Sequence, residues 1–431
     1  GTDNSVLGDN AAQNLTSGSN NVAVGRSALN NNTTASNNTA VGYQAAYNNN
    51  ANYVTAVGRA ALYSNTSGIN TAYGDFAAYS TTTGTQNTAI GAESFQDNTT
   101  GSYNTNLGFM SLHSNTTANN NTAVGYQSLY TNTTGESNVA IGLKAMYSNT
   151  TASNNIAVGY QALELNTTGG ANAALGLQAL ENNTTGGNNI ALGFRALQAN
   201  TTAYNNTAVG YQAGFSNTTG SELVAIGYDA LKSNTTGVGN IAIGYRALDV
   251  NTTASFSLAI GYNALGANTT GDTNIGVGTN AFGGTTTGGS NVGIGRDAGI
   301  NNTTGSYNIA IGRQALQSNT TASSNTAVGH QAGYDNTTGT NLVFMGVDSG
   351  YSLTSGTDQV SIGARAGYSN QTSNDNTFVG NQSGYATTGN GNTFVGVTRG
   401  GGSYGAGRYV TTGTKNTILG GYDGNQGGLD I

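Results

Sequence analysis

Three residue types are missing from this chain: none of its 431 residues is cysteine, proline or tryptophan. Without cysteine the chain can form neither a disulfide nor a thiolate metal site, and cysteine usage gives no information on the redox compartment. The absence of proline fits a structure in which nearly every backbone N–H joins a ladder of hydrogen bonds, because proline has no N–H to donate. The missing residues therefore favour regular β-structure that no disulfide supports.

Charge is also scarce, because charged residues make up 7% of the chain, whereas ordinary globular proteins carry roughly a quarter. The formal net charge is −7, and binding of nucleic acid needs a Lys/Arg face. No apolar run approaches the length of a membrane span. We therefore expect no nucleic-acid partner and no membrane span in this segment.

What the chain has instead is a repeat with a period of 17 residues, which is clearest between Gly91 and Gly380. A typical copy reads Asn-Thr-Ala-Val-Gly-Tyr-Gln-Ala-Leu, two variable residues, Asn-Thr-Thr-Gly and two more, and it recurs about 25 times. We call one copy a coil and number its positions from the Asn of Asn-Thr-Ala-Val-Gly, so that Asn121 is position 1 and Gly125 is position 5. A fixed short period indicates one unit stacked along an axis, which is a solenoid.

Each coil has the residue pattern of β-structure. Positions 2 to 4 alternate with period two, and Gly, Asn and Thr are poor helix formers. We expect a first strand at positions 1–4, a bend at the Gly of position 5, a second short strand at positions 6–9 and a turn at positions 12–15, where Asn and Gly tolerate left-handed backbone. The predicted fold is an all-β, parallel β-solenoid of about 25 coils.

The alternation also predicts which side chains face inward. Branched residues at positions 2 and 4 share one face of the strand, and we expect that face to form the interior. Position 3 is then on the outer face, where a small apolar residue suggests a second buried surface against another chain. The alanines expected at this interface between chains are Ala123, Ala140, Ala157, Ala191, Ala208, Ala225 and Ala242.

The same positions carry a family resemblance. The segments 138–142 (Asn-Val-Ala-Ile-Gly), 223–227 (Leu-Val-Ala-Ile-Gly) and 240–244 (Asn-Ile-Ala-Ile-Gly) resemble the head repeat of trimeric autotransporter adhesins, although that repeat is shorter. The full pattern, with Gly-Tyr-Gln-Ala-Leu and Asn-Thr-Thr-Gly, is also similar to repeats of phage tail fibres. The resemblance to the adhesins implies a left-handed parallel β-roll in a homotrimer, with the small residue facing the partner chains.

The repeat is regular over residues 1–380 and degenerates over 381–431, which predicts a shaft followed by a transition toward a further region. Position 3 changes to Phe at Phe344, Phe378 and Phe394, and Arg399-Gly400-Gly401-Gly402 interrupts the ladder. The chain also begins and ends in mid-repeat, so we expect flanking segments beyond both ends.

The Asn of position 12 has two interpretations. It can form an amide ladder that locks the corner of successive coils, or it can accept a glycan, because each copy is an Asn-x-Thr sequence. We favour the ladder. The residues concerned are Asn98, Asn115, Asn132, Asn149, Asn166, Asn183, Asn200, Asn217, Asn234, Asn251 and Asn268.

Two further columns could touch a ligand. Position 6 carries tyrosine in four successive coils (Tyr211, Tyr228, Tyr245 and Tyr262), and these rings can either stabilise the ladder by stacking or offer a platform for sugar rings. Thr133 and Thr134 suggest a threonine array of the ice-binding type. Adjacent residues of an extended chain point to opposite faces, so only one threonine column can line a plane.

No motif for catalysis stands out. Glu164 and Glu181 share position 10 in adjacent coils, with backbones about 5 Å apart, which resembles the spacing of a retaining glycosidase pair. The sequence supplies no cleft around them, and His113 and His330 are isolated. We expect no enzyme activity, no cofactor and no metal site.

These features favour a structural or adhesive extracellular fibre shaft on a virion or cell surface, either a phage tail fibre or a bacterial adhesin. Such a shaft holds a binding tip away from the surface and can meet a glycan or protein receptor through its side-chain columns. Two other functions stay open: a self-assembling extracellular filament, with or without glycans, and an ice-binding solenoid.

Overall fold

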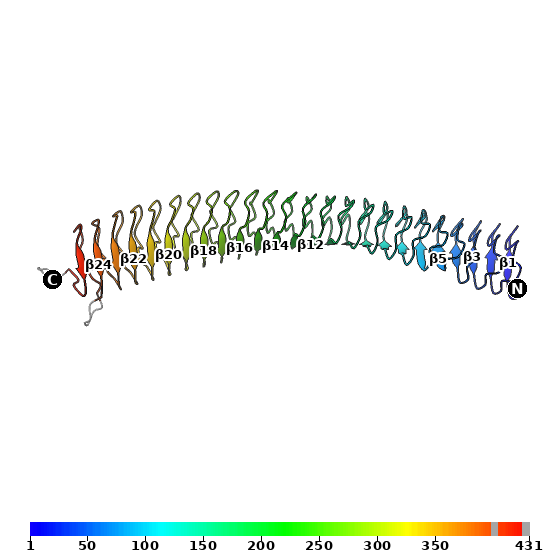
Figure 1. Ribbon diagram of the computed structural model, residues 1–431, viewed down its shortest axis with the longest axis horizontal. Helices are drawn as coiled ribbons and strands as arrows, with labels where there is room; N and C mark the ends of the chain where they lie inside the picture. The colour runs from blue at the N-terminus through cyan, green and yellow to red at the C-terminus, as the bar shows by residue number, and fades with distance from the viewer. Residues whose placement is uncertain (398–403, 425–431) are drawn as a thin grey trace. The chain divides into compact units, whose positions relative to one another are not determined.

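The computed structural model describes residues 1–397 and 404–424, and these residues form β-strands and turns with no helix. The chain divides into two compact units, Gly1–Thr219 (unit 1) and Gly220–Ile431 (unit 2). Each unit is a parallel β-solenoid with one short strand per coil, and within each unit the strands lie side by side and point the same way (Figure 1). The predicted fold class is confirmed.

Unit 1 holds thirteen strands, and each pairs in parallel with the next. Most strands are three residues long, and the register joins equal positions of successive coils, as where Ala157 lies opposite Ala174. The strands are β1 (Ser5–Leu7), β2 (Val22–Val24), β3 (Thr39–Val41), β4 (Thr55–Val57), β5 (Asn70–Tyr73), β6 (Asn87–Ile90), β7 (Thr105–Leu107), β8 (Thr122–Val124), β9 (Val139–Ile141), β10 (Ile156–Val158), β11 (Ala173–Leu175), β12 (Ile190–Leu192) and β13 (Thr207–Val209).

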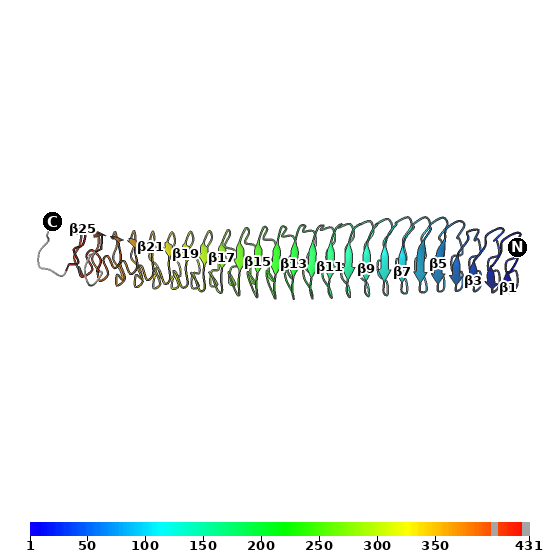
Figure 2. The same cartoon turned by 90° about the horizontal axis from the view of Figure 1, so that it is seen from below.

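Unit 2 repeats this arrangement with twelve strands (Figure 2). The register again joins equal positions, as where Ala242 lies opposite Ala259. The strands are β14 (Val224–Ile226), β15 (Ile241–Ile243), β16 (Leu258–Ile260), β17 (Ile275–Val277), β18 (Val292–Ile294), β19 (Ile309–Ile311), β20 (Thr326–Val328), β21 (Val343–Met345), β22 (Val360–Ile362), β23 (Thr377–Val379), β24 (Thr393–Val395) and β25 (Thr417–Leu419).

The second strand expected at positions 6–9 does not form. Residues from position 6 onward make turns instead, with left-handed backbone at positions 7 and 9, for example φ of 51° at Gln127 and 54° at Leu129. The turn segments still join neighbouring coils, because the Leu129 N–H donates to the Ala145 carbonyl at 2.9 Å. Gly125 begins the bend with φ of 132°, and a Cβ there would lie 2.5 Å from the carbonyl oxygen of Gly142, so only glycine fits.

The expected orientation of the strand is wrong. From β2 to β25 the position 3 residues point into the coil and are buried within the single chain, whereas positions 2 and 4 face outward. The interior is narrow: Ala at position 3 shares it with the side chains of positions 8 and 9, such as Leu129, and leaves no room for branched residues. The alanines assigned to an interface between chains therefore cannot contact a second chain: Ala123, Ala140, Ala157, Ala191, Ala208, Ala225 and Ala242 are all at most 1% exposed.

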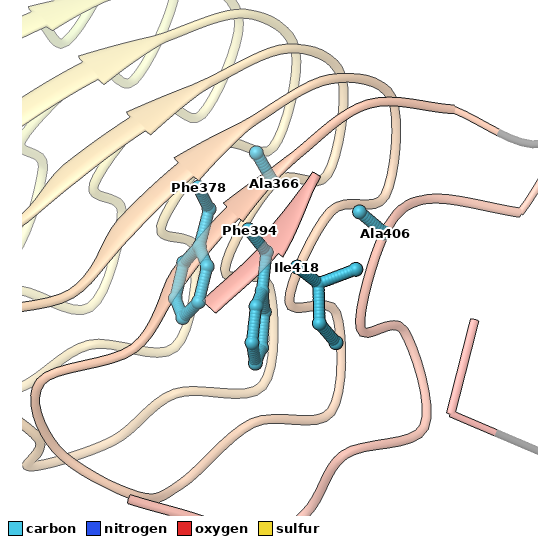
Figure 3. Close-up of a cluster of buried hydrophobic side chains, with 5 residues drawn as sticks. All are labelled: Ala366, Phe378, Phe394, Ala406 and Ile418. Carbon is cyan, nitrogen blue, oxygen red and sulfur yellow. The ribbon is translucent and has the colours of Figure 1, made fainter. Parts of the chain in front are cut away.

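The interior changes near the C-terminal end of unit 2, where phenylalanine replaces alanine at position 3. Phe378 and Phe394 are fully buried, with ring centroids 5.5 Å apart, and Ile418 follows them in the next coil (Figure 3). The predicted interruption at 399–402 lies outside the described residues. Beyond it, Gly405 forms an isolated antiparallel bridge with Val397, and β25 still pairs with β24. The solenoid therefore continues through the described part of 381–431.

Candidate interaction surfaces

The position 12 asparagines form the predicted amide ladder. Asn149 Nδ2 donates to Asn132 Oδ1 of the preceding coil at 2.8 Å and to the Ala152 carbonyl of its own coil at 3.1 Å. The same pattern runs from Asn115 to Asn217 in unit 1 and recurs in unit 2 at Asn251 and Asn268. All these side chains are 0% exposed. The nitrogen that would carry a glycan thus lies inside the coil, which leaves no room for glycosylation of the folded protein.

A second asparagine ladder runs along position 1 and donates to the same position 15 carbonyl groups as the first, as where Asn138 and Asn149 both donate to the Ala152 carbonyl. Asn155 Oδ1 accepts from the Asn172 backbone N–H of the next coil at 2.8 Å, and Asn155 Nδ2 donates to the Gly169 carbonyl at position 15 of its own coil at 3.0 Å. Burying a polar side chain is costly unless its donors and acceptors are paired. The repeated Asn at position 1 was visible in the sequence, but its spacing alone does not distinguish a ladder from a turn residue.

The position 6 tyrosines stack face to face. The ring centroids of Tyr228 and Tyr245 lie 5.2 Å apart at an interplanar angle of 10°, and those of Tyr245 and Tyr262 lie 5.2 Å apart at 5°. Tyr211 stacks on Phe194 in the same way. Because the ring faces cover one another, the column presents ring edges and hydroxyl groups to solvent. This geometry favours the stacking interpretation over a platform on which sugar rings lie flat.

A second aromatic column at position 10 was missed in the sequence. In unit 1 the Tyr63 ring lies between those of Tyr47 and Tyr79, with centroids 5.0 and 5.1 Å away. Burial, and then its two ring neighbours, raises the pKa of Tyr63. The signal was present in the sequence as tyrosine recurring at position 10, but positions beyond the expected second strand could not be assigned a direction.

The two threonines of the corner differ in their surroundings. Thr133 is half-buried, and its hydroxyl donates to the Thr150 carbonyl of the next coil at 3.0 Å. Thr134 is exposed, as are Thr151 and Thr168 at the same position of the next coils. The expectation that only one threonine column can face solvent is confirmed.

The two position 10 carboxylates are engaged in surface contacts with their neighbours. Glu164 Oε1 lies 3.8 Å from Lys144 Nζ, and burial is the main cause that raises the pKa of Glu164. Glu181 accepts hydrogen bonds from Gln178 and Gln198. Among residues 1–397 and 404–424, no group of three or more His, Asp or Glu side chains is placed to hold a metal ion.

The outward face of the strands is a largely apolar surface, made of the position 2 and 4 residues that were predicted to form the interior. Ile190 and Leu192, at positions 2 and 4 of one coil, are 48% and 45% exposed, and Ile156 is 44% exposed. Position 4 is apolar or aromatic in every described strand, position 2 is an apolar residue, threonine or serine, and none of these strands carries a charged residue. We call positions 2 and 4 of the strands the apolar face.

No model of a known protein family matches this sequence, and no curated protein is significantly similar to it. Within the part of the chain that the structure describes, no helix is long and apolar enough to cross a membrane.

Proposed function

We propose that this chain is a structural segment of an extracellular fibre, in which copies of the chain associate side by side through the apolar face. The fibre would hold a binding tip away from a virion or cell surface, where the tip meets a glycan or protein receptor. The observation that carries the proposal is an exposed strand face that carries no charge and has an apolar or aromatic residue at position 4 in every described strand.

The size of the apolar face supports association. Full burial of an Ile, Leu or Val side chain contributes about 1.5–3 kcal/mol, which at ~25 cal/mol per Å² corresponds to roughly 60–120 Å² of apolar surface. A side chain that is 40% exposed therefore still offers on the order of 40 Å² of apolar surface to a partner. Position 4 in the thirteen coils of unit 1 and position 2 in five of them are apolar, so the face offers at most on the order of 700 Å², close to the ~800 Å² that each partner buries in a stable interface. The largest apolar patch of a typical monomer is only about 300–600 Å².

The repeat itself favours a second copy as the partner. The apolar face recurs once per coil, at the spacing of paired strands, about 4.8 Å. A partner that buries the face along its length needs the same axial repeat, and another copy of this chain has it. The resemblance to trimeric adhesins favours three copies, but the contact surface would be positions 2 and 4 instead of the alanines of position 3.

Charges placed on the apolar face test this proposal. The triple variant Ile156→Lys, Ile190→Lys and Leu192→Lys should lower the native mass from oligomer to single chain in light scattering, because three buried ammonium groups would repel across the interface. The matched control is Thr134→Lys, Thr151→Lys and Thr168→Lys on the exposed corner, which should leave the mass unchanged. A wild-type protein that is already a single chain, or a face variant with unchanged mass, would refute the proposal. Electron microscopy would separate discrete fibres from the indefinite filaments of a self-assembling protein.

The exposed threonine column keeps ice binding as a second candidate. Thr134, Thr151 and Thr168 present hydroxyl and methyl groups once per coil, next to a rigid backbone ladder. Thermal hysteresis of the wild-type protein that is lost in the Thr134→Lys, Thr151→Lys and Thr168→Lys variant would support this function. Absence of hysteresis in the wild type would exclude it.

A further inference from the structure

The position 10 tyrosines form columns of phenol rings that are aligned from coil to coil. Tyr47 and Tyr63 are inclined by only 8°, and Tyr63 and Tyr79 by 17°. Unit 2 holds a longer column with centroid distances of 5.0, 5.1 and 5.0 Å along Tyr334, Tyr351, Tyr368 and Tyr385. The parallel register of the coils causes this alignment, because equal positions stand next to each other.

Each of these rings is half-buried. At the end of the unit 2 column, the Arg408 guanidinium lies 4.7 Å from the Tyr385 ring centroid and covers its face. Neighbouring phenols are thus held next to each other, while their burial limits encounters with rings of other chains. A reaction that joins two phenols would therefore occur between coils of the same chain.

The composition makes phenols the main targets of one-electron oxidation. The chain has 24 tyrosines and three methionines but neither cysteine nor tryptophan. In most proteins thiols are oxidised first, and indoles compete for oxidising radicals. Here neither group is present to intercept the oxidant.

We propose that the position 10 columns are sites of oxidative tyrosine coupling, in which a haem peroxidase with hydrogen peroxide joins tyrosines of adjacent coils as dityrosine. Each of two phenols loses one electron and one proton to give a phenoxyl radical. The radicals form a bond between one Cε of each ring, and the hydrogen of each of these carbons then moves as a proton to the oxygen of the same ring, which restores the aromatic rings and both hydroxyl groups. The two electrons and two protons reduce one hydrogen peroxide to two waters, so the reaction balances.

Such a bond would staple adjacent coils covalently. A link between Tyr47 and Tyr63 closes a loop of about one coil, which restricts the unfolded chain much as a disulfide does. The chain would thereby gain the cross-links that its lack of cysteine denies it. This inference does not depend on whether copies of the chain associate.

Oxidation of the full chain at low concentration tests the inference. We expect peroxidase and hydrogen peroxide to produce dityrosine fluorescence at the mass of a single polypeptide under denaturing conditions, and proteolytic peptides linking Tyr47 to Tyr63 or Tyr63 to Tyr79, each two hydrogen masses lighter than the sum of its parts. Tyr63→Phe should abolish both linked peptides, since phenylalanine preserves the stack but forms no phenoxyl radical.

The matched control is Tyr53→Phe, which removes an exposed tyrosine of the same unit. It should leave the linked peptides of Tyr63 unchanged. Circular dichroism of both variants would verify that the fold is retained. The inference is overturned if the oxidised wild type contains no peptide linked through Tyr63, or if its dityrosine joins mainly different chains.

Discussion

The regular coils and the C-terminal coils of unit 2 fill the same interior in opposite ways. In a regular coil the small residue is at position 3 and the large one at position 9, as with Ala242 and Leu248. In the coil of β21 the large residue is Phe344 at position 3, and Gly350 at position 9 has φ of 58° and no side chain. A Cβ on Gly350 would overlap the Phe344 ring. In these two coils the interior volume is thus shared by positions 3 and 9, and a large residue at one is matched by a small residue at the other.

The coils around β17 and β18 show the same exchange in a third form. Phe282 at position 9 is fully buried, and both strands beside it carry glycine at position 3, Gly276 and Gly293. The Phe282 ring occupies the space that a Cβ on Gly293 would need. Because close-packed interiors tolerate neither voids nor overlap, the large ring at position 9 of this coil is accommodated by glycine at position 3 of the strands beside it.

The largest effect should come from giving a C-terminal coil the large residue of a regular coil. We expect Gly350→Leu to lower the free energy of unfolding by about 3 kcal/mol, because overpacking forces the backbone apart. Backbone conformation is no obstacle, since Leu129 adopts φ of 54° at the same position. Urea denaturation followed by circular dichroism measures the change.

The second substitution that sharpens this comparison is Phe344→Ala in the Gly350→Leu background, which rebuilds the regular pair. It should restore most of the lost stability, and the two substitutions should therefore be strongly non-additive. If the double variant is no more stable than Gly350→Leu alone, the exchange of volume between the two positions is not what sets the C-terminal interior.

A smaller effect is expected where the two regions differ at position 12. Asn132 of a regular coil is part of the amide ladder, whereas Leu353 replaces it in the coil of β21. Asn132→Ala should cost about 2 kcal/mol, because it leaves buried partners of the ladder unpaired. Thr134→Ala on the exposed corner is the control and should change stability by no more than about 0.5 kcal/mol. Equal losses in both variants would mean that the ladder adds no stability.

Alkaline pH should affect the tyrosine columns of both regions in the same direction. Burial is the main cause that raises the pKa of Tyr63 and of Tyr351 above the ordinary value of 10.0. A raised pKa in the folded state favours the protonated form, so this contribution to stability is complete below the ordinary pKa and is lost as the pH rises through the raised value. The difference between the absorbance titration curves of the wild type and of Tyr63→Phe or Tyr351→Phe isolates the phenol that the variant lacks, and this phenol should titrate above pH 10. A missing phenol that titrates below this pH would contradict the assignment.

The sequence was sufficient for the solenoid, the coil boundaries and the Asn132 ladder, because all three follow from the period. It was insufficient for the direction of the strand. The alternation of Thr122, Ala123 and Val124 separates the two faces of the strand but does not show which face is inside. Branched residues favour a β-strand whether they face the interior or the outside. Only the width of the coil decides, and that width depends on the turns.

Those turns were the second obstacle. The sequence gives no sign that Gln127 and Leu129 adopt left-handed backbone, because glycine and asparagine are the residues that usually adopt this conformation. Without these turns, positions 6–9 looked like a strand, and the tyrosine column at position 10 had no assigned direction. The division after Thr219 had no counterpart in the sequence, since the period passes through it unchanged.

The smallest effect should come from surface charge, in regular and C-terminal coils alike. Arg59 donates two hydrogen bonds to Asp75, at 2.7 and 2.6 Å, and this is the main cause that lowers the pKa of Asp75. A lowered pKa means that the pair stabilises the folded state above the ordinary carboxyl pKa and loses this effect as the pH falls through the lowered value. Both side chains are largely exposed, so solvent screens the pair.

Asp75→Asn should shift the urea midpoint less than Asn132→Ala does and should remove the part of the stability that is lost in acid. Asp348→Asn, which removes the 3.3 Å contact with Arg365, is the C-terminal counterpart. A shift larger than that of Asn132→Ala in either variant would show that charge, rather than interior volume, distinguishes the two regions.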